Sequence, residues 1–483
     1  MPPLKINEAV VRKTAARCKE RGVVIPTFRQ MRDPALVPEK IKARLKKTGL
    51  WDVDPANLFR ITWHNDVKTG LFGGVNCLEL PSSLTGARAR VIGLVGKYFP
   101  TGAHKVGAAF GCLAPRLVSG EFDPSAQKAV WPSTGNYCRG GAFDSALLGA
   151  TAVAILPEGM SRERFEWLKS IGAEVIATPG TESNVKEIYD KCWEIKKTRK
   201  DCVVFNQFEE FGNPVWHYHT TGPALEEAFN AVKGASGRLA GFVSATGSAG
   251  TIAAGDYLKK KFPGVKIAAS EALQCPTLLQ NGFGEHRIEG IGDKHIPWVH
   301  NVRNTDMVVA IDDEACMRLL RLFNEEEGKK ILAAYGVGKN VIDSLPLLGI
   351  SGISNMLSAV KLAKYYDLDE NDVVVTVFTD SSDLYKSRLE ELRAARGAYT
   401  RDNALSDMER RLLGTTVDYL RELSYTDRKA RHNLKYFTWV EQQGRTSDEL
   451  RKLWDPEFWD ETFAQAGEWD RLIEEFNKLS GLV

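Results

Sequence analysis

The chain has 483 residues, which is too long for one hydrophobic core and predicts two or three domains. Its 64 basic and 62 acidic residues leave a net charge of +2, so the composition argues against nucleic acid and against an anionic membrane surface as partners. The eight scattered cysteines include no C-x-x-C pair, and the longest apolar run, 146–156, is too short to span a bilayer. We therefore expect a soluble cytoplasmic protein with reduced thiols and no structural zinc site.

The first half of the chain begins with a charged segment, 1–60, whose pattern is helical, for example at 38–45, and which we expect to be a packed N-terminal extension. From residue 61 onward, short β-branched runs alternate with Gly-rich turns and amphipathic helices. This alternation is typical of a doubly wound parallel sheet with helices on both faces. The predicted strands are 89–94, 127–131, 151–156, 174–177 and 202–205, and the predicted helices include 162–168 and 184–197.

A second block of the same texture starts near residue 212. Its predicted strands are 240–244, 265–269, 307–311 and 373–378, and its predicted helices include 222–233 and 352–364. From 396 to 483 the pattern is helical again, with capping boxes expected at Ser406-x-x-Glu409 and Thr446-x-x-Glu449. Four tryptophans in this last segment predict a folded helical appendage that packs on the body or on a neighbouring subunit.

One lysine stands out as a candidate nucleophile. The stretch 100–109 is a Pro/Gly turn that presents Lys105 and then runs into small apolar residues, which places the lysine at the start of a helix. The positive end of the helix dipole and the exclusion of water both disfavour an ammonium there, so the amine would be nucleophilic. The alternative is an ordinary surface lysine at a helix start.

Three further features accompany this lysine. They are the turn Ser133-Thr134-Gly135-Asn136, the Gly-rich turn 245–251 between a predicted strand and helix, and a serine, Ser381, after the last strand. The Gly-rich turn lacks the spacing of a dinucleotide fingerprint and of a Walker loop, and alone it is weak evidence of a phosphate site. Together the four features supply what pyridoxal phosphate needs: an imine-forming amine, a hydrogen bond to the ring hydroxyl, a phosphate cup and a partner for the ring nitrogen.

With these motifs the chain resembles the fold-type II pyridoxal-phosphate enzymes, most closely the cysteine synthase and cystathionine β-synthase group, from about residue 75 to residue 395. The motif Gly-Ala-His-Lys, which ends at Lys105, is more similar to the tryptophan synthase β subunit than to cysteine synthase. The resemblance rests chiefly on the stretches 156–164, 207–214, 220–223, 247–251 and 286–292. It implies an α/β fold with two doubly wound parallel-sheet domains and helical extensions. The expected division is 1–60 as N-terminal extension, 61–100 plus 211–395 as large cofactor-binding domain, 101–210 as smaller domain with Lys105 and the Asn136 loop, and 396–483 as C-terminal extension.

The resemblance also implies roles for individual residues. Lys105 would form the imine with the cofactor and later move the substrate's α-proton, and Asn136 would bond the ring hydroxyl. The phosphate would lie on Gly247, Ser248, Ala249, Gly250 and Thr251, and the substrate α-carboxylate on Ser133, Thr134, Gly135 and Gln207.

The residue opposite the ring nitrogen decides the expected reaction. A hydroxyl at Ser381 would not hold the nitrogen protonated, which favours loss of a β-substituent to an aminoacrylate. The neighbouring carboxylate, Asp380, is the alternative, and it would make transamination or racemisation plausible.

Three more residues come into consideration for a role in the site. Arg139 stands where the resemblance leads us to expect a small residue, and its guanidinium could bind an acidic group of the substrate or leaving group, or instead form a protein salt bridge or face solvent. His217 and His219 could suggest a metal pair, but no third ligand is obvious and we expect no metal.

We therefore expect a pyridoxal-phosphate lyase or transferase that performs β-elimination or β-replacement on a small serine- or cysteine-type amino acid. The alternatives are an amino-acid dehydratase or ammonia-lyase that releases a keto acid, and a partner-dependent subunit of a synthase complex. The resemblance also predicts a homodimer.

Overall fold

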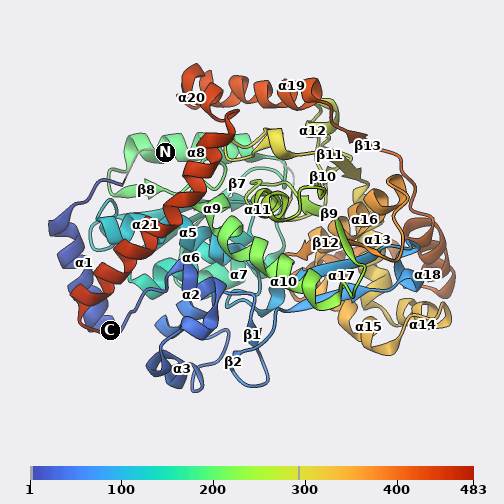
Figure 1. Cartoon of the computed structure of the whole chain (residues 1–483), viewed down its shortest axis with the longest axis horizontal. Coiled ribbons are helices and arrows are strands. Elements are labelled where there is room, and N and C mark those ends of the chain that lie inside the picture. Colours follow the sequence, from blue (N-terminus) through green and yellow to red (C-terminus); the bar gives the residue numbers. More distant parts are fainter. Residues whose placement is uncertain (1–3, 292–293, 483) are drawn as a thin grey trace.

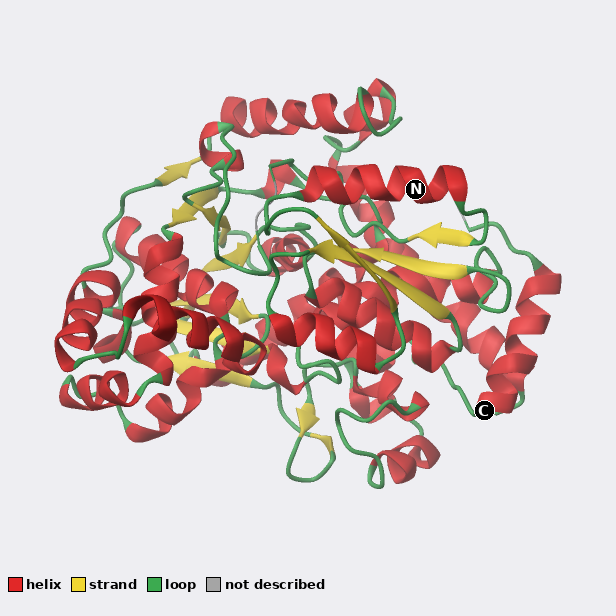
Figure 2. Cartoon of the chain, turned by 180° about the vertical axis from the view of Figure 1, so that it is seen from behind, coloured by secondary structure: helices red, strands yellow, loops and turns green. Residues whose placement is uncertain are grey.

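Two separate sheets, each surrounded by helices, make up the body of the computed structural model, which describes residues 4–291 and 294–482 (Figure 1). Seen from behind, the strands form two groups with helices between and around them (Figure 2). The predicted α/β class and the predicted parallel pairing within each sheet are confirmed, with one correction at the sheet edges.

The smaller sheet has the strand order β7-β6-β5-β8, and its pairs are all parallel. Val130, Val153 and Ile155 are fully buried, as expected for strands that are covered on both faces. Its strands are β5 (Lys128–Pro132), β6 (Thr151–Pro157), β7 (Glu174–Thr178) and β8 (Cys202–Val204), connected through the helices α6 (Asn136–Leu148), α7 (Arg162–Ser170) and α8 (Val185–Thr198).

The larger sheet has the order β13-β11-β10-β9-β12-β4-β3. Its five central strands are parallel, but both edge strands are antiparallel, so the expectation of a purely parallel sheet is wrong at the edges. The edge strands are short and half exposed, and they carry no apolar run that sequence reasoning could detect. The strands are β3 (Cys77–Leu80), β4 (Arg90–Val95), β9 (Arg238–Ala245), β10 (Lys266–Ala272), β11 (Met307–Ile311), β12 (Asp372–Phe378) and β13 (Leu420–Glu422).

The helix α5 (Lys105–Ser119) connects the two sheets, since it follows β4 of the larger sheet and precedes β5 of the smaller one. It packs closely on α9 (Gly212–Trp216), where Gly111 and Gly212 face each other and a Cβ on either would collide with the backbone of the other. Glycine at both positions therefore fixes how α5 lies in the body.

The two ends of the chain pack on each other and on the body. The last helix, α21 (Pro456–Ser480), contacts α1 (Glu8–Arg21) and α5, as the adjacent blue and red ribbons in Figure 1 illustrate. Asn477 Oδ1 accepts from Ile25 N at 3.0 Å, and its Nδ2 donates to Ile25 O at 2.8 Å. The C-terminal segment is thus a folded appendage on the body, and through β13 it also extends the larger sheet beyond the predicted boundary at residue 395.

The capping-box predictions had mixed outcomes. Thr446 and Glu449 form the expected box, whereas Ser406 lies inside α18 (Arg401–Asp407), whose box is formed by Thr400 and Asn403. The prediction at Ser406 was wrong because the N-cap of this helix is Thr400, six residues earlier. The other α-helices and strands are α2 (Phe28–Arg32), α3 (Glu39–Leu45), α4 (Ser82–Thr85), α10 (Gly222–Val232), α11 (Ala254–Lys261), α12 (Thr277–Gln280), α13 (Asp313–Asn324), α14 (Glu326–Ala334), α15 (Lys339–Ser344), α16 (Ile350–Tyr365), α17 (Lys386–Arg396), α19 (Tyr425–Lys435), α20 (Ser447–Lys452), β1 (Asn65–Asp66) and β2 (Leu71–Phe72).

Within the described ranges, no helix combines the length and the apolar character needed to cross a bilayer. The eight cysteines are free thiols.

Candidate active site between the two sheets

The predicted nucleophile, Lys105, is the first residue of α5. Its Nζ donates to Ser248 Oγ at 3.0 Å. Burial lowers the pKa of the amine to about 8, and the carboxyl group of Glu182 acts in the opposite direction. A substantial fraction of the amine is therefore neutral just above neutral pH, which is the form that attacks carbonyl groups.

The Gly-rich turn lies directly beside this amine. It follows β9, and none of the four amides of residues 247–250 donates a hydrogen bond to a described residue. Ala249 has a φ of 57°, a left-handed conformation that lets successive amides point to one side. The turn is therefore a set of free donors suited to an anion such as a phosphate.

Two neutral histidines support the end of this turn. His104 Nε2 lies 3.1 Å from Thr251 Oγ1, and His217 Nε2 lies 3.4 Å from the same oxygen. Burial, reinforced by the Lys105 charge, lowers the pKa of His104 to about 3, and burial also lowers the pKa of His217 well below its ordinary value. Neither ring carries a charge at neutral pH, so both act as hydrogen-bonding supports.

The second histidine of the suspected metal pair faces elsewhere. His219 Nε2 contacts Phe463 O at 2.7 Å, and His217 Nδ1 contacts Thr221 Oγ1 at 2.9 Å. The segment 217–221 is a π-helical turn, so the two rings do not share one face as they would on a strand.

Asn136 opens α6, which packs on α5. Its Nδ2 donates to Asp380 Oδ2 at 2.6 Å, and the same oxygen accepts from Tyr385 OH at 2.7 Å. Asp380 lies two residues beyond the end of β12 in the larger sheet, so this contact joins the two halves of the molecule. One hydrogen of Asn136 Nδ2 is used here, and the other is available to a ligand.

The serine that was predicted to face a ring nitrogen points to a different neighbour. Ser381 Oγ donates to Asp383 Oδ2 at 3.3 Å, and Asp383 is ion-paired with Lys97 at 2.7 Å. Asp380, rather than Ser381, contacts Asn136.

The residues predicted for a substrate carboxylate lie together around the turn after β5. Ser133 Oγ accepts from Gly135 N at 2.9 Å, and Gln207 Nε2 lies 3.5 Å from Pro132 O. Ser133 and Gln207 are buried, and Gly135 has a φ of 150°. The turn is thus compact, and its Thr134 carbonyl is held by Arg164.

Two arginines lie near Asp380 in contrasting surroundings. Arg164 is fully buried and contacts Thr134 O, Tyr385 OH at 3.0 Å and the Glu289 carboxylate at 3.4 Å. Arg139 is 4% exposed, and its guanidinium carbon lies 4.7 Å from the ring centre of Trp167. Burial, and the charge of Arg164 with it, lower the pKa of Arg139 to about 10.

Sequence reasoning missed three residues of this site. Glu182 is fully buried, accepts a hydrogen bond from Gly290 N, and has a pKa raised to about 8 by burial. Ser351 is a buried hydroxyl in the first turn of α16 without a hydrogen-bond partner among the described residues, and Tyr385 holds Asp380. The small residues at 349–354 were a usable sign of Ser351, but nothing in the sequence singles out Glu182 or Tyr385.

Buried polar atoms without partners gather at this site. In the described part of the chain they include Asn136 Oδ1, Arg139 Nε and Nη1, Asn213 Oδ1, Ser351 Oγ and Asp380 Oδ1. Such atoms are costly unless a ligand pairs with them. The site therefore has the character of a polar ligand pocket with an amine at one end and a phosphate-type turn beside it.

Comparison with known proteins places this arrangement among related chains. A family model described as pyridoxal-phosphate dependent enzyme matches residues 97–336. The cysteine synthase of Staphylococcus aureus is 30% identical over 323 residues, which are 67% of this chain and 96% of that protein. The cystathionine beta-synthase of Saccharomyces cerevisiae is 25% identical over 418 residues, which are 84% of this chain and 76% of that protein.

Solved structures give the same grouping. A hydrogen sulfide-producing enzyme from Fusobacterium nucleatum is 28% identical, with a TM-score of 0.55 over 68% of this chain and 92% of that one. An O-acetylserine dependent cystathionine beta-synthase from Helicobacter pylori is 25% identical, with a TM-score of 0.55 over 65% of this chain and 95% of that one.

Proposed function

The chain belongs to the pyridoxal-phosphate dependent enzymes of fold type II, and on that premise we propose that it eliminates or replaces the β-substituent of a small serine- or cysteine-type amino acid. Relatives named for this chemistry, a cysteine synthase and an O-acetylserine dependent cystathionine beta-synthase, support the proposal. The observation that carries it is the Lys105 amine, which contacts the Gly-rich turn through Ser248.

The residues present fit the cofactor. The amine of Lys105 matches its aldehyde, and the four free amides of residues 247–250 match its phosphate. The free hydrogen on Asn136 Nδ2 matches the ring hydroxyl. When bound, pyridoxal phosphate withdraws electrons from the substrate's α-carbon and so labilises its α-proton.

The protein's side chains would bind the substrate and transfer its α-proton. Lys105 holds and moves the proton at the substrate's α-carbon, because its lowered pKa lets the amine both accept and return a proton near neutral pH. The turn 133–135 and Gln207 bind the substrate carboxylate, where the Ser133 hydroxyl and the compact backbone supply donors.

We assign a hydroxyl group as the partner of the cofactor's ring nitrogen, and two serines are candidates. Ser381 is the candidate from the sequence, and the unpartnered hydroxyl of Ser351 is a second candidate. Either one would leave the nitrogen unprotonated, which favours β-elimination over transamination. One oxygen of the Asp380 carboxyl group, Oδ2, already accepts from both Asn136 and Tyr385, so Asp380 is less suited to the ring nitrogen than an unpartnered hydroxyl.

The proposal extends to the setting of the enzyme. We place it in the cytoplasm, because its eight cysteines are unpaired, and we assign it a homodimer from the family resemblance.

The test begins with the purified protein, which should be yellow from bound cofactor. Borohydride reduction followed by peptide mapping should place the cofactor on Lys105. A panel of β-substituted amino acids should then release keto acid, or yield a new amino acid when a thiol is added. A colourless protein that does not take up pyridoxal phosphate, or a label on another lysine, would overturn the proposal.

The same panel separates the alternatives. Keto acid as the product even with excess thiol would indicate a dehydratase or ammonia-lyase. Turnover that appears only with a second, co-purifying polypeptide would indicate a subunit of a synthase complex.

A further inference from the structure

The two buried arginines near Asp380 differ in one respect that bears on the substrate. The guanidinium of Arg164 has four protein partners: a carbonyl oxygen, a thioether sulfur, a phenol and the carboxylate of Glu289. None of the nitrogens of the Arg139 guanidinium makes a hydrogen bond or an ion pair with a described residue, and Nε and Nη1 are fully enclosed. One arginine is thus part of the framework, and the other is left without an acceptor.

An unpaired buried guanidinium destabilises the folded state. Charged groups that leave water without a partner cost several kcal/mol, so buried charges in proteins are normally paired. Arg139 cannot escape this cost by losing its proton, because even its lowered pKa of about 10 keeps it charged at neutral pH. The cation–π contact with the Trp167 ring offsets part of the cost, but it supplies no hydrogen-bond acceptor.

The neighbouring carboxylate of Asp380 does not act as the missing acceptor for Arg139. Asp380 is attracted to Arg139, yet its Oδ2 accepts from Asn136 and Tyr385, and no ion pair forms between Asp380 and Arg139. A net positive group therefore remains beside the predicted ring-binding asparagine. Its natural complement is an anion that arrives with a ligand.

Arg139 is also close to the chemistry. It lies three residues after Asn136 on α6, so the two share a helix face. Asp380 connects them, since its carboxyl group attracts Arg139 and accepts from Asn136 Nδ2. The other anions expected in the site already have candidate binders, the phosphate on the turn 247–251 and the α-carboxylate on the turn 133–135.

We propose that Arg139 binds an anionic group on the substrate's side chain, so that the preferred substrates are amino acids with a carboxylate, phosphate or sulfonate at or beyond the β-carbon. This inference rests on the proposed function, because it assigns the third anion of a bound amino acid. Trp167 lies against the guanidinium, and Asp380 offsets its charge only in part.

Binding of unreactive amino acids to the holoenzyme tests this assignment without turnover. L-Aspartate and L-asparagine form a matched pair, since they differ only in the charge of the side chain. Titration followed by the visible spectrum of the bound cofactor, with calorimetry as a second readout, should give an affinity for aspartate about 10–100-fold above that for asparagine, as expected for a charge-assisted pair.

The variant Arg139→Gln should remove that preference by weakening aspartate and leaving asparagine within about twofold. Arg139→Lys should restore part of it, because the charge remains and the fork is lost. The matched control is Arg162→Gln, an exposed arginine at the start of α7, which should change neither affinity.

The outcomes separate this inference from the proposed function. Equal binding of aspartate and asparagine to the wild type, or an aspartate preference that survives in Arg139→Gln, would refute the anion site while the proposed reaction stands. Failure of every amino acid to perturb the cofactor spectrum would refute the proposed function itself. In turnover, O-phosphoserine should exceed serine in kcat/KM by more than that factor, because phosphate is also the better leaving group, and Arg139→Gln should lower the ratio about 10–100-fold through KM.

Discussion

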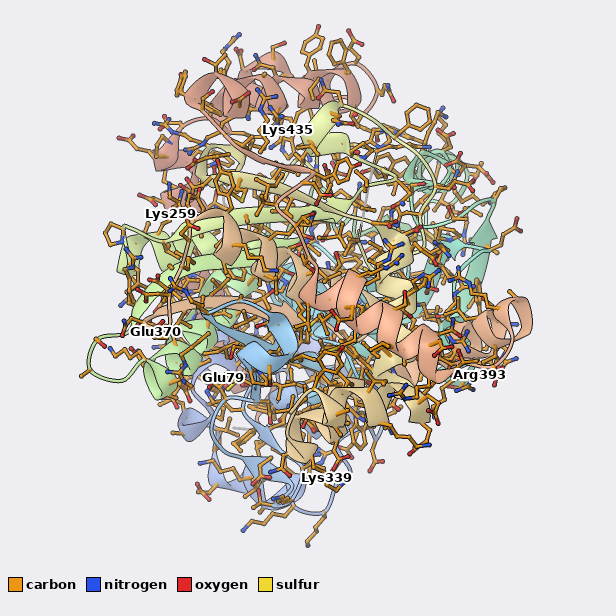
Figure 3. The ribbon with its side chains drawn as sticks, turned by 90° about the vertical axis from the view of Figure 1, so that its right-hand side faces the viewer. Glu79, Lys259, Lys339, Glu370, Arg393 and Lys435 are labelled. Carbon is orange, nitrogen blue, oxygen red and sulfur yellow. The ribbon has the colours of Figure 1, made fainter. Side chains whose placement is uncertain are left out.

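Two regions of this molecule bury a lysine, and they do so in opposite ways. At the start of α5, Lys105 contacts a single hydroxyl, and nearby atoms of Asn136, Arg139 and Asp380 have no protein partner. In α19 of the C-terminal appendage, Lys435 is fully buried and donates to Trp298 O at 2.9 Å and to His300 O at 2.7 Å. Figure 3 labels this residue in the upper, C-terminal part of the molecule.

The difference shows how a buried lysine with a role in catalysis can be told from one with a structural role. From residue 420 to residue 482, Arg428 Nε is the only buried side-chain nitrogen or oxygen without a hydrogen-bond partner among those that the structure describes. Around Lys105 such atoms gather. Burial lowers the pKa of both lysines, so a perturbed pKa alone does not distinguish them, whereas the supply of partners does.

Replacing Lys105 should produce the largest effect and should spare the fold. In Lys105→Ala we expect the covalent cofactor to disappear and kcat to fall on the order of 10³-fold or more, because both the attachment point and the proton carrier are lost. Reduction with borohydride, followed by mass spectrometry, checks the attachment. The thermal midpoint of the apo-protein should stay within a few degrees of wild type, and a large drop would mean that Lys105 is framework, as Lys435 is.

Replacing Lys435 should show the reverse pattern. Lys435→Ala leaves two buried carbonyls unpaired and opens a cavity, so we expect a loss of about 2–4 kcal/mol in the free energy of unfolding, with cofactor affinity and kcat of the folded enzyme unchanged. Urea denaturation measures the loss. Lys452→Ala, at an exposed position of α20, is the matched control and should stay within about 0.5 kcal/mol.

The pH dependence of stability gives a further test of the role of Lys435. Burial lowers the pKa of Lys435 well below its ordinary value, so the folded state binds fewer protons than the unfolded state between the two pKa values. Stability should therefore rise with pH through that window, up to about pH 10.4, and Lys435→Met should remove this part of the slope. An unchanged slope in Lys435→Met would contradict the assignment.

The contact between the two sheets gives a third, smaller effect. Asp380→Asn removes the charge from the acceptor that holds Asn136 Nδ2 at 2.6 Å, so the amide loses its fixed orientation. We expect cofactor affinity to fall about tenfold, with a shifted visible spectrum of the bound cofactor, because Asp380 positions Asn136. Asp383→Asn is the comparison, since it frees Ser381, and a larger effect there would favour Ser381 as the important neighbour of the cofactor.

The sequence predicts the strands and the helix starts well because buried parallel strands are continuous apolar runs and the key turns contain glycine. It singles out Lys105, Asn136 and the turn 247–251 as candidates because each follows a strand or opens a helix. It does not predict that Asn136 meets Asp380, 244 residues away, or that Glu182 is buried near Lys105, because these contacts depend on how the two sheets pack. The antiparallel edge strands β3 and β13 were missed for a related reason, since a short edge strand is defined by its neighbour more than by its own residues.

Glu182 supplies the smallest and most local prediction. Its carboxyl group raises the pKa of Lys105, against the stronger effect of burial, which lowers it to about 8. In the apo-protein the neutral fraction of the Lys105 amine, and hence its rate of acylation, should increase as the pH rises through about 8 and then level off. Glu182→Gln removes the negative charge, so the midpoint should move to lower pH, by about half a unit, because Glu182 itself titrates near pH 8 and is only partly ionised there. Peptide mapping after brief acylation at a series of pH values measures the midpoint, and Glu187→Gln, in the following helix α8, should leave it in place. A shift to higher pH would mean that Glu182 acts on Lys105 through structure and not through its charge. Glu182 would then be a structural residue, as Lys435 is in the C-terminal appendage.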